Sequence, residues 1–350
     1  MAQPLLTVDD LSVTFPTRRG AAAAVRGLSY ELRPGETLAI VGESGSGKSV
    51  SALALLGLLP RGASVSGRAE FRGDDLLTMS ASKRRSIRGN EISMIFQDPM
   101  TAFNPVYTIG DQIVEAIRIH RPKVSKKEAY AEAEGLLDQV GVPEARRRVH
   151  QYPHEFSGGM RQRAMIAMAI ANQPALLIAD EPTTALDVTI QAQVMEVLAE
   201  AREATGSAMI LITHDLGLVA GVADRIIVMY GGHAFETGDT RTVFYDTKNP
   251  YTRGLLESIP RLTDGDGVRL QPIPGAPPSI LRMPSGCAFA PRCVYRTDIC
   301  EEVPPALEPV AEGHWSRCHH KESLPPFTAS QEAASHEAAS QGAASQEAGA

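Results

Sequence analysis

The sequence predicts an α/β fold with a parallel sheet at its core, and two patterns lead to this prediction. Three short apolar runs stand at residues 38–41, 175–179 and 209–212, each typical of a strand buried on both faces. Stretches with helical spacing separate these runs, and this alternation is typical of α/β domains. The chain has 350 residues, 43% of them hydrophobic, which is enough for one large core and a smaller second unit.

Charge and hydropathy narrow the classes of function. The formal net charge of −7 argues against a protein that binds nucleic acid by neutralising phosphates, although a local basic patch could lie within an acidic total. The longest apolar run, residues 52 to 59, is shorter than the roughly 18 residues that a membrane span needs. The first residues lack a basic segment followed by an apolar core, so we expect no secretory signal and a cytoplasmic protein.

Strands are expected before the first apolar run, and helices between the runs. Residues 5 to 15 and 28 to 32 are rich in β-branched and aromatic side chains with partial alternation, which predicts two short strands. Residues 110 to 140 have helical spacing, with apolar residues such as Ile113 and Leu137 separated by charges. We interpret this stretch as an inserted helical subdomain.

The C-terminal part differs in composition from the rest of the chain. Prolines become frequent after Tyr251, and all four cysteines follow them, which predicts a separate, loop-rich appendage. From Ser330 onward a five-residue repeat offers no large apolar side chain to bury. We expect this tail to be disordered, with a transient helix as the alternative.

Residues 42 to 49 have the pattern of a phosphate-binding loop. They read Gly-Glu-Ser-Gly-Ser-Gly-Lys-Ser, which fits G-x-x-x-x-G-K-[ST], and they stand between an expected strand and an expected helix. Backbone N–H groups would surround the phosphates, Lys48 would reach the β- and γ-phosphates, and Ser49 would bind Mg²⁺. Chance alone would produce the pattern in about one chain in a hundred, so it is not decisive by itself. The expected nucleotide contacts are Gly42, Glu43, Ser44, Gly45, Ser46, Gly47, Lys48, Ser49 and Val50.

Two carboxylates directly follow the second apolar run. Asp180 and Glu181 thereby stand at the carboxyl end of a parallel strand, the edge of an α/β sheet where ligands bind. Asp180 would hold Mg²⁺ through water, and Glu181 would act as the catalytic group that orients and activates the attacking water. A solvated acidic turn is the alternative, but the position after an apolar strand favours the catalytic interpretation.

A second anion site is predicted where a long helix begins. Ser157, Gly158 and Gly159 stand at its N-terminus, where backbone N–H groups and the helix dipole favour a phosphate. Together with the phosphate loop and the Asp180-Glu181 pair, this motif makes the sequence resemble the ATPases of ABC transporters. In that family the motif contacts the γ-phosphate held by the opposite subunit, so the resemblance implies two ATPase domains that meet head to tail.

Four further positions match motifs of that family. The resemblance identifies Gln97 with the glutamine that senses Mg²⁺ and the attacking water, and His214 with the catalytic switch histidine near the γ-phosphate. It also identifies Asp187 with the loop that crosses the dimer interface, and Phe15 with the aromatic ring that stacks on adenine. Each residue alone could be structural, and their order along the chain is what supports the assignment.

The serine-glycine-glycine motif departs from the commoner family pattern, because Phe156 and Met160 replace a leucine and a glutamine. This variant resembles the peptide-importer branch of the family. The likeness covers about residues 5 to 320 and is closest to the ATP-binding proteins of bacterial dipeptide transport. The segments with the closest likeness are 96–101, 152–154, 180–193 and 249–252.

The resemblance implies an ABC-type nucleotide-binding domain with a parallel-sheet core, an antiparallel β subdomain and an inserted helical subdomain. ATP and Mg²⁺ would be its cofactors. Its partners would be a second, different ATPase subunit, two transmembrane permease subunits and, indirectly, an extracytoplasmic substrate-binding protein, with no nucleic acid. The chain would power import of dipeptides or oligopeptides from the cytoplasmic face of the inner membrane. One alternative is the same role with another cargo, such as nickel, glutathione or another peptide-like solute. The other alternative is a soluble ABC ATPase that takes no part in transport.

Three regions are expected along the chain. An ABC ATPase domain would span residues 1–245, with its helical subdomain at about 98–163. A C-terminal region of the peptide-importer type, with the cysteines, would span residues 246–322. The disordered repeat tail would then occupy residues 323–350.

The spacing of the cysteines, C-x₅-C-x₆-C-x₁₇-C, fits neither a zinc knuckle nor a ferredoxin. Clustered cysteines in a cytosolic chain favour a metal site over disulfides. The resemblance implies a [4Fe–4S] cluster with a structural role in a segment that has little core of its own. Two alternatives to the cluster stay open: the cysteines could bind zinc, or they could be free or paired. His314 or His319 could also replace one cysteine as a ligand. The candidate cluster ligands are Cys287, Cys293, Cys300 and Cys318.

Overall fold

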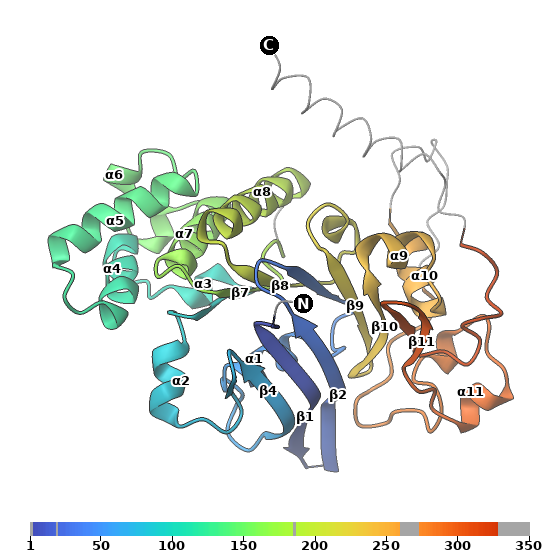
Figure 1. Cartoon of the computed structure of the whole chain (residues 1–350). Helices are drawn as coiled ribbons and strands as arrows, with labels where there is room; N and C mark the ends of the chain where they lie inside the picture. The colour runs from blue at the N-terminus through green and yellow to red at the C-terminus, as the bar shows by residue number, and fades with distance from the viewer. Residues whose placement is uncertain (1–2, 19, 185–186, 260–272, 328–350) are drawn as a thin grey trace.

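The computed structural model describes residues 3–18, 20–184, 187–259 and 273–327, which form two β-sheets with helices packed around them (Figure 1). Within these ranges no helix is long and apolar enough to cross a bilayer. The repeat from Ser330 lies outside the described residues, so the disorder predicted for it stays a prediction.

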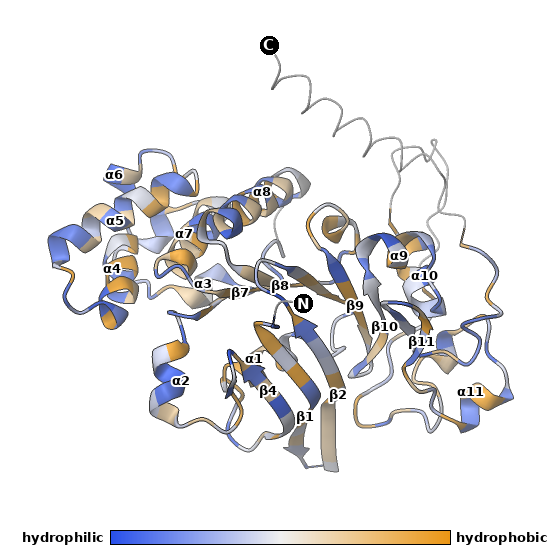
Figure 2. Cartoon of the chain, viewed as in Figure 1, coloured by the Kyte–Doolittle hydropathy of each residue, from blue (hydrophilic) through white to orange (hydrophobic). Residues whose placement is uncertain are grey.

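The smaller sheet is antiparallel and confirms the two strands predicted near the N-terminus. It contains β1 (Leu6–Thr17), β2 (Gly20–Leu32), β4 (Ser64–Phe71) and β5 (Asp74–Asp75), in the order β2-β1-β4-β5. Apolar and polar residues alternate along β1, with Leu6, Val8, Leu11 and Val13 buried, as expected for a sheet with one face on a core (Figure 2). β2 is longer than predicted because its first half is a run of alanines, which carry no strand signal.

The larger sheet has a parallel centre and an antiparallel edge. It contains β3 (Thr37–Val41), β6 (Ile92–Ile95), β7 (Leu176–Asp180), β8 (Ala208–Thr213), β9 (Arg225–Tyr230), β10 (His233–Asp239), β11 (Glu308–Ala311) and β12 (His314–Ser316). Their order in the sheet is β11-β12-β10-β9-β3-β8-β7-β6. Every residue of β3, β7 and β8 is buried, which confirms the three predicted strands and explains their apolar sequences. β6 and β9 are parallel strands beyond these three.

The carboxyl ends of these parallel strands meet at one edge of the sheet and bring the predicted motifs together. β3 leads into the loop at residues 42–47, which is followed by helix α1 (Lys48–Leu55). β7 ends at Asp180 and is followed by Glu181, while β6 is followed closely by Gln97 and β8 by His214. Segments far apart in sequence therefore converge on one site.

The helical subdomain is an insertion between β6 and β7, and its core is continuous with one face of the large sheet (Figure 1). Ile113, Ile117 and Leu137 are fully buried within it, as the helical spacing predicts. Thr108 and Ser125 cap two of its helices, and Ser125 forms a capping box with Glu128. Its helices are α3 (Pro99–Ala102), α4 (Ile109–His120), α5 (Lys126–Gln139), α6 (Ala145–Arg148) and α7 (Gly158–Ile170). The 3₁₀ turn Pro153–Glu155 also belongs to this insertion, while α2 (Ala81–Ile87), α8 (Val188–Thr205) and the 3₁₀ turn Gly217–Val219 lie elsewhere.

The prediction of a separate C-terminal appendage is wrong, because this region extends the large sheet. β12 pairs with β10, with Ser316 opposite Glu236, and β11 pairs with β12. Phe289 packs on Tyr230 and Tyr251, with ring centroids 5.4 and 5.3 Å away. The helices here are α9 (Thr240–Tyr245), α10 (Pro250–Glu257), α11 (Asp298–Glu302) and the 3₁₀ turn Ala290–Arg292.

The physical reason for this difference lies in what the rest of the chain supplies. Without β12, β10 would be the edge strand of the large sheet, and strand edges readily accept another strand. The rings of Tyr230, Phe235 and Tyr251 form an apolar cluster, and Ala288 and Phe289 of the C-terminal region complete it. A proline-rich segment with little apolar material can therefore become ordered without a core of its own.

Candidate functional site

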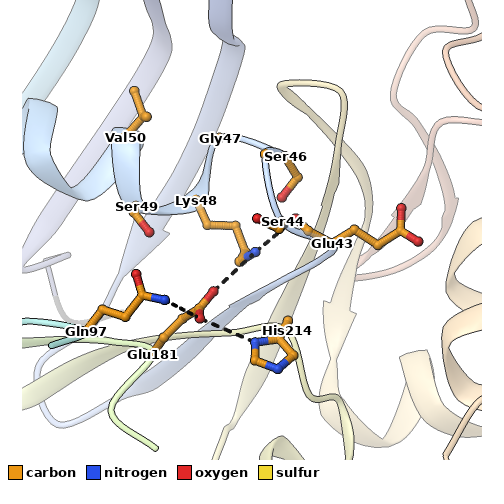
Figure 3. Close-up of a pocket in the computed structure, with 11 residues that line it drawn as sticks. Glu43, Ser44, Ser46, Gly47, Lys48, Ser49, Val50, Gln97, Glu181 and His214 are labelled. Atoms are coloured by element: carbon orange, nitrogen blue, oxygen red, sulfur yellow. Dashed lines mark hydrogen bonds and ion pairs between the residues drawn. The ribbon is translucent and has the colours of Figure 1, made fainter. Parts of the chain in front are cut away.

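The phosphate loop borders a cavity of about 480 Å³ at the carboxyl edge of the large sheet. Gln97, Glu181 and His214 line the same cavity, so three of the separately predicted positions do come together (Figure 3). The loop residues around the cavity are Glu43, Ser44, Gly45, Ser46, Gly47, Lys48, Ser49 and Val50.

Two glycines of the loop occupy positions that no other residue could fill without displacement. Gly42 has a φ of 151°, and a Cβ there would lie 2.1 Å from the carbonyl oxygen of Met229. Gly47 has a φ of 102°, and a Cβ there would lie 2.3 Å from the carbonyl oxygen of Ala24. The path of the loop therefore depends on glycine for both conformation and space.

Lys48 is held inside the loop. Its Nζ donates to the carbonyl oxygens of Gly42 and Glu43 at 2.6 and 3.1 Å and lies 3.9 Å from Oε1 of Glu181. Burial lowers the pKa of Lys48, while the carboxylates of Glu181, Asp180 and Glu43 oppose that shift. A cation fixed beside backbone N–H groups is the arrangement that binds phosphate oxygens.

Glu181 lies at the centre of the site. Its Oε2 accepts hydrogen bonds from Nε2 of Gln97 at 3.0 Å and from Oγ1 of Thr184 at 2.9 Å, and it lies 3.4 Å from Nδ1 of His214. In Figure 3 the side chains of Lys48, Gln97 and His214 all point toward this carboxylate. Its backbone is in the left-handed region with a φ of 47°, a strained conformation that is common at functional sites. The carboxylate is thus fixed in one orientation.

Asp180 lies directly behind the loop. Its Oδ1 accepts a hydrogen bond of 2.7 Å from Oγ of Ser49, and its side chain is buried. Burial raises the pKa of Asp180, and the hydrogen bond from Ser49 opposes this. A hydroxyl and a carboxylate side by side are hard oxygen ligands of the type that Mg²⁺ prefers, so this pair fits the predicted magnesium site.

The remaining predicted nucleotide contacts lie outside this cavity. Ser157 is exposed and caps α7, where its Oγ accepts from the backbone N–H of Met160 at 3.4 Å. Asp187 caps α8 in the same way through Ile190, and the two residues before it are outside the described ranges. Phe15 is half-buried against the core of the smaller sheet. The roles assigned to Phe15, Asp187 and the Ser157, Gly158, Gly159 motif stay predictions.

The structure adds contacts that the motifs did not identify. Thr184 fixes Glu181 as described, and two residues of the C-terminal region hold the side chain and the backbone of Glu43. Arg292 donates to both carboxylate oxygens of Glu43, at 2.6 and 2.9 Å, and the hydroxyl of Tyr251 accepts from the Glu43 N–H at 2.9 Å. No local pattern reveals a pair that stands 249 positions apart.

The four cysteines of the predicted metal cluster are free thiols in one region of the chain. Burial, together with the neighbouring cysteines, raises the pKa of Cys293 to about 11 and of Cys318 to about 12. Within the described ranges, however, no three or more histidine, cysteine or acidic side chains are arranged to hold a metal ion. The structure therefore does not support the predicted metal site.

Family models match two parts of the chain. The ABC transporter model matches residues 25–184, which include the phosphate loop, Gln97 and Glu181. A model of the oligopeptide/dipeptide transporter C-terminal region matches residues 235–300.

Curated relatives cover most of the chain. The oligopeptide transport ATP-binding protein OppD of Salmonella typhimurium is 51% identical over 317 residues, which is 91% of this chain and 94% of that protein. OppD of Mycobacterium tuberculosis is 52% identical over 319 residues, but the chain spans about half, 52%, of its length. A putative peptide import ATP-binding protein of Brucella abortus is 50% identical over 328 residues, covering 90% of this chain and 97% of that protein.

Solved structures show the same fold. A dimeric ATP-binding cassette in a post-hydrolysis state with ADP and phosphate aligns with a TM-score of 0.60 and 25% identity, covering 67% of this chain and 99% of that one. The cbiO1 cassette of Clostridium perfringens, part of an ABC transporter complex, aligns with a TM-score of 0.58 and 26% identity, covering 69% of this chain and 91% of that one.

Proposed function

The chain belongs to the ATP-binding subunits of ABC transporters, in their oligopeptide and dipeptide group, and on that basis we propose that it hydrolyses ATP to power peptide import across a membrane. The single observation that carries this proposal is the position of Glu181, a strained carboxylate at the centre of a cavity that the phosphate loop borders.

The arrangement suits attack of water on a γ-phosphate. The loop and Lys48 bind the phosphates, and Glu181 accepts a proton from the attacking water while Gln97 and His214 hold the carboxylate and the water in line. Mg²⁺, held by Ser49 and Asp180, would neutralise phosphate charge. Removing the water's proton as it attacks lowers the barrier without a covalent intermediate.

A second ATPase subunit, different from this one, would complete the site. Ser157 is exposed, and it begins a helix whose first N–H groups suit a phosphate. It lies outside this chain's own cavity, so the phosphate it contacts would belong to the partner. The dimeric form of the similar ATP-binding cassette supports the pairing of two cassettes, and the difference between the two subunits rests on the family likeness.

The helical subdomain would dock on two permease subunits at the cytoplasmic face of the inner membrane. Val106 and Ile119 are each 71% exposed and Tyr107 is 54% exposed, an unusual density of apolar surface after the Gln97 loop. A disulfide from Asn104→Cys to a permease cysteine tests this contact, with Glu31→Cys on β2 as the control. Cross-linking from Glu31 but not from Asn104 would contradict the docking.

The finer assignments rest on the family likeness. Cargo is expected to be dipeptides or oligopeptides, with nickel, glutathione or another peptide-like solute as the alternative. The proposed regions are 1–245 for the ATPase, 246–322 for the C-terminal part and 323–350 for the tail. A [4Fe–4S] cluster on Cys287, Cys293, Cys300 and Cys318 is proposed on the family likeness alone.

Transport by the assembled complex tests the proposal. The chain, its partner ATPase, both permeases and the binding protein are reconstituted in vesicles and given labelled dipeptide, oligopeptide or nickel with ATP. We expect ATP-dependent peptide uptake that Lys48→Ala abolishes, because the lost phosphate contacts are worth several kcal/mol. Nickel uptake without peptide uptake would contradict the assignment of peptides as the cargo. Uptake that does not depend on ATP would contradict the proposed function.

A further inference from the structure

The phosphate loop is tied to the C-terminal region by Arg292. Its guanidinium donates to Oε2 of Glu43 at 2.6 Å and to Oε1 at 2.9 Å, a bidentate pair across 249 positions of sequence. Such pairs fix orientation as well as charge, because two parallel hydrogen bonds allow only one geometry.

Arg292 is itself rigidly held. Its side chain is 5% exposed, its Nε donates to the carbonyl oxygen of Pro274 at 2.9 Å, and it lies over the rings of Tyr230 and Phe289. The Glu43 side chain is 25% exposed and belongs to the loop that borders the cavity. The arginine is therefore the fixed member of the pair, and the glutamate is the member that is positioned.

The main chain of Glu43 is held from the same side. Its N–H donates to the hydroxyl of Tyr251, a fully buried residue on α10. Tyr251 packs on Phe289, which lies three positions before Arg292, so both contacts on Glu43 come from one packed unit. Two residues of this unit, Arg292 and Tyr251, thus hold the second residue of the loop through three hydrogen bonds.

The negative charge of Glu43 connects this contact to the affinity for nucleotide. A triphosphate is a polyanion, and an unpaired carboxylate in the loop that binds it would repel it. Figure 3 shows the Glu43 carboxylate pointing away from Lys48, toward the C-terminal ribbons and out of the cluster around Glu181. Arg292 holds the carboxylate in this direction and neutralises its charge.

We propose that Arg292 and Tyr251 are positioning residues for nucleotide binding, through which the C-terminal region of this chain sets the affinity of the phosphate loop. The inference rests on the proposed ATP-binding function and adds to it a role for a region outside the nucleotide motifs. Arg292 acts through Glu43 and touches no nucleotide itself. A region that closes the sheet edge thereby also controls the ATP site.

The test measures binding of a fluorescent ATP derivative to the full chain with Mg²⁺. Arg292→Met keeps the contact with the aromatic rings but frees the Glu43 charge, and we expect about tenfold weaker binding. The loss should shrink at high salt, which screens the repulsion. Adding Glu43→Gln to Arg292→Met should restore most of the affinity, because the repelling charge is then gone.

The matched control is Arg317→Met. Arg317 also lies in the C-terminal region and holds it through the carbonyl oxygens of Ala234 and Pro305, each at 2.9 Å, but it has no contact with the loop. We expect it to lower the melting temperature and to leave the affinity of the folded chain unchanged. Arg292→Lys and Tyr251→Phe serve as milder variants, with intermediate loss of affinity expected, should Arg292→Met fail to fold.

The outcomes separate the inference from the function on which it rests. Rescue of Arg292→Met by Glu43→Gln supports the positioning role, since an arginine that only held the C-terminal region in place would leave ATP affinity low after the Glu43 charge is removed. Wild-type affinity in every Arg292 and Tyr251 variant, or an equal loss in Arg317→Met, would overturn it. A folded wild-type chain that binds no ATP derivative would overturn the proposed function and the inference together.

Discussion

Gly42→Ala tests whether nucleotide binding depends on the backbone path of the phosphate loop. The φ of 151° at Gly42 belongs to a region that residues with a side chain rarely adopt, and the new Cβ would lie 2.1 Å from the Met229 carbonyl oxygen. Strain at such a position costs about 1–3 kcal/mol, and overpacking costs about 1–3 kcal/mol more. The native loop would thus lose about 2–6 kcal/mol relative to a displaced one.

A displaced loop no longer directs its N–H groups at the phosphates, and each factor of ten in affinity corresponds to about 1.4 kcal/mol. We therefore expect ATP to bind at least about 25-fold more weakly to Gly42→Ala. Titration with a fluorescent ATP derivative gives the affinity, and thermal unfolding in the absence of nucleotide shows whether the chain remains folded.

Gly206→Ala is the matched control. Gly206 also has a positive φ, 64°, but a Cβ there would meet nothing within 4 Å, and it ends α8 away from the cavity. The substitution should cost stability of about 1–2 kcal/mol and leave ATP affinity unchanged. If Gly42→Ala bound ATP within about threefold of wild type, the loop would not need this backbone path and the reasoning would be refuted.

Three further predictions follow from the site and its surroundings. Thr184→Val removes a hydrogen bond to Glu181 and should slow ATP turnover about tenfold without weakening ATP binding, and turnover at the wild-type rate would contradict this. Burial, aided by Arg317 and Arg26, lowers the pKa of His233 from 6.5 to about 4, so the unfolded chain takes up a proton before the folded one and stability should fall as the pH drops through this window. His233→Asn should flatten that fall in thermal unfolding measured between pH 7 and pH 5, and an unchanged slope would refute the assignment. The [4Fe–4S] cluster proposed from the family likeness is tested by anaerobic purification: about four irons and four sulfides per chain, lost in Cys300→Ser, would support it. Zinc alone would indicate a zinc site instead, and the absence of both metals would leave the four cysteines without a cofactor.

The centre of the fold and of the site was predictable because its signals are local. β3, β7 and β8 are buried on both faces, so their sequences are continuous apolar runs. Parallel strands place their carboxyl ends on one edge, so Gln97, Glu181 and His214, each just beyond such a strand, had to lie near the phosphate loop. The chain topology converts separate short motifs into one site.

The C-terminal edge of the large sheet was less predictable, because its residues become ordered only through contacts with segments far away in the sequence. The C-terminal residues join a strand edge and an aromatic core built by β9, β10 and α10, which composition alone does not reveal. The contact of Arg292 with Glu43 depends on the same packing. An arginine in a proline-rich stretch carries no local sign that its partner is a phosphate loop.

The most direct test of the central claim is ATP hydrolysis by the reconstituted transporter that contains Glu181→Gln. The amide keeps the size of the side chain and can still contact Lys48, Gln97 and Thr184, but it cannot accept a proton from water. We predict that this complex binds ATP as tightly as wild type while hydrolysis falls by about a hundredfold or more, the usual contribution of a general base. Hydrolysis at the wild-type rate, with nucleotide bound, would contradict the assignment of Glu181 as the group that activates the attacking water.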